Sequence, residues 1–162
     1  MSNTTEGDKI GDRLQKWLLE DGYKIQSQPD KNTSFRIIAT DNQGIKIQVL
    51  QPIAKPDQVV IAAGLNISED RQHTLQSKDD KEQLRILWEL RFGLLDLGVG
   101  FRQISMPLQN VEVSTLIYYD GLTKNAFMNE YSKVKRAVLF VFWTIDRELG
   151  EPKPKSNPEY VD

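Results

Sequence analysis

The chain has 162 residues, of which 39% are hydrophobic and 27% charged, a balance typical of a globular domain. Its 21 basic and 23 acidic residues give a net charge of −2, which argues against a nucleic-acid-binding protein. There is no cysteine, so disulfides and cysteine nucleophiles are excluded. The apolar run from Ala137 to Trp143 is too short to cross a membrane, and we expect no signal peptide at residues 1–8, because they lack an apolar stretch. We therefore expect a cytoplasmic protein.

The composition along the chain divides it into three parts. Residues 1–7 are predicted to be a disordered leader, residues 8–150 a single α+β domain, and residues 151–162 a flexible, proline-rich tail. Within the domain, Ile10, Leu14 and Leu18 recur at helical spacing and predict a first helix from Asp8 to Asp21. Gly22 supplies the left-handed residue that ends such a helix.

Three strands are predicted after this helix. Alternating apolar residues at 35–39 and 45–49 flank the sequence Asp-Asn-Gln-Gly at 41–44, which is typical of the turn in a β-hairpin. The mainly apolar segment 58–63 predicts a third strand inside the sheet. We interpret the polar stretch that follows Ile67, up to Asp80, as a loop.

The second half of the domain begins with a helix predicted at about 78–97, capped by Ser77 and Asp80 and ended by Gly98. Strands at 99–106 and 111–119 follow, and a third helix runs from Thr123 to about Gly150. The order is α-βββ-α-ββ-α. It predicts an α+β fold with an antiparallel sheet of about five strands, covered on one face by three helices.

Catalytic and metal-binding motifs are scarce in this sequence. His73 is the single histidine, and only Glu69 and Asp70 accompany it nearby. The glycines match neither the dinucleotide-binding nor the phosphate-loop spacing. We therefore expect a non-enzymatic protein without a metal or a cofactor. An enzyme would have to assemble an acid–base pair from distant residues, such as His73 and a carboxylate.

The second helix has a polar and an apolar side. The side predicted to face water carries charged residues: Glu82, Arg85, Glu89 and Asp96. The side predicted to face the core is apolar: Leu84, Leu87, Trp88, Leu94 and Leu95. Arg91 lies in the middle of that apolar side, where a charge is costly unless it is paired. Either Arg91 meets a carboxylate or carbonyl groups within the fold, or it lines a cleft that binds an anionic group.

The third helix has two apolar sides. One is a continuous core stripe: Phe127, Tyr131, Val134, Val138, Val141, Ile145 and Leu149. The other carries Leu139, Phe140 and Trp143 between Arg136 and Arg147, a combination common in protein interfaces. Either another helix of the same domain covers this second side, or a partner does. Our hypothesis is that the second side forms the seam of a homodimer.

Three stretches of the chain resemble a known family: LWELR at 87–91 with GVGF at 98–101, YYDGLT at 118–123 with Phe127-Met128, and LFVFW at 139–143. Together they resemble a family of uncharacterised archaeal and bacterial proteins, a domain of unknown function, over about residues 8–150. The order of elements is also similar to the fold of type III secretion chaperones and their non-secretory relatives. Those are small acidic α+β domains that commonly dimerise and bind segments of other proteins, so the resemblance implies an interaction module.

We therefore expect a non-catalytic protein-interaction module, chaperone-like in character, that acts as a homodimer and takes a protein or peptide client. The expected surface is the Phe140/Trp143 patch together with the exposed side of the sheet. The alternative is a protein that binds a small anionic ligand in a cleft around Arg91.

Overall fold

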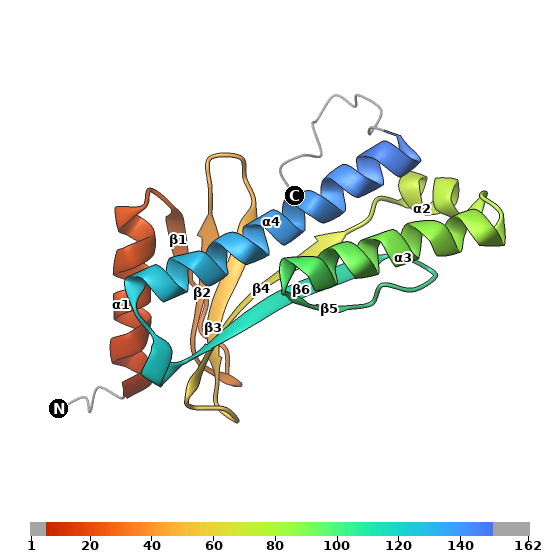
Figure 1. Cartoon of the computed structure of the whole chain (residues 1–162). Helices are drawn as coiled ribbons and strands as arrows, with labels where there is room; N and C mark the ends of the chain where they lie inside the picture. The colour runs from red at the N-terminus through yellow and green to blue at the C-terminus, as the bar shows by residue number, and fades with distance from the viewer. Residues whose placement is uncertain (1–5, 151–162) are drawn as a thin grey trace.

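The computed structural model describes residues 6–150, and within them it contains a six-stranded antiparallel sheet and four α-helices (Figure 1). The strand order in the sheet is β1-β2-β3-β4-β6-β5. The α+β class and the antiparallel pairing agree with the sequence prediction, but the described chain has one strand and one helix more than predicted. The leader prediction for residues 1–5 and the tail prediction for 151–162 lie outside the described residues. Glu6 and Gly7, assigned to the leader, belong to the first helix.

The first half of the fold follows the predicted order closely. Helix α1 (Glu6–Glu20) buries Ile10, Leu14 and Leu18, and Gly22 has the left-handed conformation, with φ of 84°, directly after it. Strands β2 (Thr33–Thr40) and β3 (Lys46–Pro52) form the predicted hairpin, and β4 (Gln58–Asn66) is the predicted internal strand. Helix α1 lies against β2, where the ring of Phe35 contacts the backbone at Gly11.

Two elements in this part of the chain were missed. Strand β1 (Lys24–Ser27) has a single apolar residue and exists because it pairs with β2 at the edge of the sheet. Helix α2 (Glu69–Gln76) occupies the stretch that was interpreted as a loop, and it buries only Leu75. A charged contact between Arg71 and Asp146 ties α2 to the last helix. Neither element has the apolar periodicity on which the prediction depends.

The second half contains the longest helices. Helix α3 (Asp80–Leu97) is capped by Asp79, whose side chain accepts a hydrogen bond from the Glu82 amide, and ends at Gly98. Strand β5 (Gly100–Arg102) is shorter than predicted and pairs with β6 (Asn110–Tyr118). After a short 3₁₀ turn, η1 (Tyr119–Gly121), Thr123 caps helix α4 (Lys124–Leu149) as predicted.

The core lies between one face of the sheet and the helices. Alternate residues of β2, β3, β4 and β6 are buried beneath α1 and α4, and α4 buries the whole stripe predicted for it, from Phe127 to Leu149. The opposite face of the sheet carries a row of partly exposed apolar side chains, in which Leu50, Val60 and Leu116 are cross-strand partners. With Ile38 and Tyr118 this row forms what we call the open sheet face.

Asp41 connects the hairpin turn to α4. Its Oδ1 accepts hydrogen bonds of 2.9 Å from the Gln43 and Ile45 amides, and its Oδ2 lies 2.9 Å from Nζ of Lys135. Burial raises the pKa of Asp41, but the hydrogen bonds from Lys135 and from the two amides together outweigh burial and hold the pKa below its usual value.

Replacing this carboxylate with an amide tests how much the connection stabilises the fold. We expect Asp41→Asn to lower the free energy of unfolding at pH 7 by about 1–2 kcal/mol. Because the folded pKa is lowered, the stabilisation is fully present above the unfolded pKa of about 3.9 and is lost as the pH falls through the folded value. Urea denaturation at pH 7 and near pH 2 measures both limits, and the exposed Asp12→Asn serves as the control. An equal difference between variant and wild type at both pH values would contradict the assignment.

Candidate functional site

Helices α3 and α4 lie antiparallel and are joined by a charged seam. Arg85 of α3 donates a hydrogen bond of 3.2 Å to Glu148 of α4, and Arg147 of α4 is paired with Glu89 of α3. The hydrogen bond from Arg85 lowers the pKa of Glu148, although burial opposes the shift. Arg85 and Glu89 therefore lie at the contact with α4, and the side chain of Arg85 is still 47% exposed, so the charged side of α3 is solvent-accessible, as predicted, and is also paired with α4.

Helix α3 also has an apolar side that is exposed. Ile86, Leu87, Leu90 and Leu94 are buried and hold α3 on the core. Three residues that were predicted to face the core, Leu84, Trp88 and Leu95, are exposed, and Phe92 joins them. The rings of Trp88 and Phe92 stack on each other with their centroids 5.5 Å apart. The helix therefore has two separate apolar stripes, and only one of them is covered by the described chain.

Trp143 of α4 is a fifth large apolar side chain that is exposed on these two helices. We call Leu84, Trp88, Phe92, Leu95 and Trp143 the outer helical face; their exposed fractions are 52%, 49%, 62%, 66% and 67%. The sequence prediction did not separate the exposed apolar residues of α3 from its buried ones, because α3 is apolar over most of its circumference. A signal was present, however. Residues 87, 90, 94 and 97 form one stripe at helical spacing, and residues 84, 88, 92 and 95 form another.

The residues predicted for the interface are distributed around α4. Trp143, Arg136 and Arg147 are exposed, whereas Leu139 and Phe140 are partly buried. Phe140 is enclosed by α3 to a large extent, because its ring lies directly over Gly93; a Cβ built there would be 1.9 Å from the Cζ atom. A shallow, open hollow lies beside this contact and is lined by Glu89, Phe92, Gly93, Leu95, Asp96 and Phe140.

Arg91 is held within its own chain. Its Nε and Nη2 donate hydrogen bonds of 3.1 and 2.7 Å to the carbonyl oxygen of Ile104, and the guanidinium lies 4.8 Å from the centre of the Trp88 ring. This is the first of the two arrangements considered from the sequence, in which carbonyl groups satisfy the charge. The bond ties the segment after β5 to α3.

Other titratable groups within residues 6–150 include two tyrosines, whose pKa values are raised, and one histidine. His73 is exposed on the small helix α2. Burial raises the pKa of Tyr119 to about 12 and also raises that of Tyr131, so both phenols stay protonated near neutral pH. Within residues 6–150 no group of three or more histidine, aspartate or glutamate side chains could hold a metal ion. No helix in the same range is long and apolar enough to span a bilayer.

The fold and this surface define an α+β protein in which helices cover one face of an antiparallel sheet and leave apolar side chains exposed on their own outer side. The chain belongs to the uncharacterised conserved family DUF2299, whose model matches residues 10–145. The resemblance to an uncharacterised family, a domain of unknown function, is thereby confirmed.

Comparison with solved structures gives a similar result. An uncharacterised protein from Methanothermobacter thermautotrophicus is 28% identical in sequence and has a TM-score of 0.81. The match covers 86% of this chain and 98% of the other. No relative was found among functionally curated proteins.

Substitution of Arg91 distinguishes a structural role, in which it binds the carbonyl of Ile104, from a role in binding an anionic ligand. We expect Arg91→Leu to lower the free energy of unfolding by about 1–3 kcal/mol, because the carbonyl of Ile104 loses both hydrogen bonds. Urea denaturation measures the loss, with the exposed Arg102→Leu as the control. Unchanged stability combined with loss of inorganic phosphate binding in calorimetry would favour the anion-binding alternative instead.

Proposed function

We propose that the protein is a non-catalytic protein-interaction module that acts as a homodimer. The observation that supports this proposal is the outer helical face, on which three aromatic and two leucine side chains are about half or more exposed. Soluble monomers rarely leave so many large apolar side chains in water on two neighbouring helices, and aromatic residues next to arginines are frequent in interfaces. Arg136 and Arg147 lie on the same helix as Trp143 and are exposed beside it.

The second surface of the proposal is the open sheet face. Leu50, Val60 and Leu116 form an apolar row across three neighbouring strands, and Tyr118 is exposed next to it. We propose that this face takes a segment of another protein, in the manner of a chaperone, while the helices on the other side of the sheet form the dimer. The anion-binding alternative has less support, because the guanidinium of Arg91 already binds Ile104 and stacks on Trp88.

A charge placed on the outer helical face tests the proposal. We expect the wild type to sediment with twice the 18.6 kDa mass of one chain, and Trp143→Glu to sediment with the mass of one chain. Burying an unpaired carboxylate in an interface is costly, whereas an exposed one in the monomer is not. The matched control is Leu19→Glu, a leucine that is 56% exposed on α1. If Trp143→Glu is well folded and still sediments with the mass of the wild type, the proposed dimer interface at Trp143 is contradicted.

A further inference from the structure

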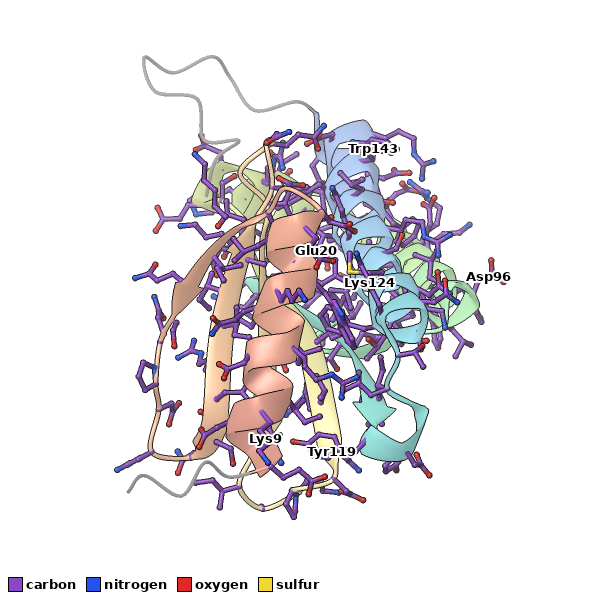
Figure 2. All side chains as sticks on the ribbon, turned by 90° about the vertical axis from the view of Figure 1, so that its left-hand side faces the viewer. Lys9, Glu20, Asp96, Tyr119, Lys124 and Trp143 are labelled. Atoms are coloured by element: carbon purple, nitrogen blue, oxygen red, sulfur yellow. The ribbon has the colours of Figure 1, made fainter. Side chains whose placement is uncertain are left out.

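The exposed stripe of α3 is bounded by opposite charges at its two ends. From Leu84 to Leu95 it runs about 16 Å along the helix. Lys81 lies one turn before the stripe in the sequence of α3. Asp96, which Figure 2 labels, lies at the other end of the stripe. Both side chains are exposed, and neither makes an ion pair with another residue in the range 6–150. The nearby Arg85 and Glu89 are already engaged in the seam with α4.

The apolar stripe and the two charges share one midpoint, close to residue 89. A surface of this kind is complementary to itself when the second copy is turned end to end, as across a two-fold axis. Two α3 helices in parallel would instead place Lys81 against Lys81 and Asp96 against Asp96. The antiparallel arrangement also aligns the helix dipoles favourably.

We propose that a second copy of the chain docks here, α3 against α3 in antiparallel orientation, with Lys81 of each protomer paired with Asp96 of the partner subunit. This inference rests on the proposed function and specifies its partner and its register. Leu84 and Leu95 of opposite protomers meet at the two ends of the contact. The stacked Trp88 and Phe92 pack near its centre, and Trp143 flanks it from α4.

The area of the face fits such a contact. A tryptophan or phenylalanine side chain buries about 150–250 Å², so the exposed fractions leave roughly 270–450 Å² on Trp88, Phe92 and Trp143 together. The two leucines and the aliphatic parts of flanking side chains raise this area toward the value of about 800 Å² per partner that a stable interface buries.

A membrane surface fits the outer helical face less well than a second copy of the chain does. Helices that lie on membranes favour an excess of basic residues, and here the charges at the two ends of the stripe cancel.

Charge-reversal substitutions at the two ends of α3 test how the two α3 helices are aligned in the proposed dimer. In a homodimer of Lys81→Glu, the new glutamate lies opposite Asp96 of the partner subunit at both ends, so two carboxylates repel each other. In a homodimer of Asp96→Lys, the new lysine lies opposite Lys81 of the partner subunit, so two ammonium groups repel each other. We expect each variant to dimerise about tenfold more weakly than wild type in sedimentation equilibrium at low salt. An equimolar mixture of the two should form heterodimers with at least wild-type affinity, because both end pairs are then attractive. Native mass spectrometry resolves the heterodimer by its mass.

This rescue cannot arise within one chain, because fifteen residues of helix separate positions 81 and 96 by about 22 Å. The control is Lys9→Glu on α1, at the other end of the molecule (Figures 1 and 2), which should neither weaken its homodimer nor prefer Asp96→Lys as a partner. If both variants dimerise like wild type while Trp143→Glu is monomeric, the register is wrong and the proposed function stands. If the wild type is itself a monomer, both proposals fail.

Discussion

The arrangement of the described chain depends on how α4 packs across the sheet. Its buried stripe, which begins at Phe127, lies over β4 and β6. Along its length it carries charged contacts to α1, to the hairpin turn, to α2 and to α3. Lys124 bonds to Glu20 of α1 (Figure 2), Lys135 pairs with the hairpin turn, Asp146 meets α2, and Glu148 accepts from α3. Apolar burial therefore places α4 on the sheet, and charged contacts join α1, the hairpin turn, α2 and α3 to it.

The parts of the fold that the sequence predicts are those whose local pattern matches their environment. The hairpin was predictable because alternation on both sides of the turn at 41–44 specifies strands with one buried face. Strand β1 and helix α2 were not, because each depends on something distant in the chain. Strand β1 needs its pairing with β2, and α2 needs the contact between Arg71 and Asp146. Such contacts leave no periodicity within the segments themselves.

The candidate surface was predicted in part for a similar reason. The second apolar side of α4 was predicted to be covered either by another helix or by a partner; α3 lies over Phe140, whereas Trp143 is exposed. The prediction for α3 was wrong where it assigned every apolar residue of the helix to the core. Arg85 pairs with Glu148 and Glu89 with Arg147, so the charged side of α3 lies along the edge of α4. Leu84, Trp88 and Leu95 are exposed, and a helical wheel of α3 alone does not separate them from the buried stripe.

The placement of the aromatic residues has an optical consequence. The chain has three tryptophans, and Trp88 and Trp143 both lie on the outer helical face, whereas Trp17 packs against the core beside Phe127. Indole emission responds to the polarity around the ring. The intrinsic fluorescence of the protein therefore comes mainly from the outer helical face. Its emission wavelength should shift when another molecule covers that face.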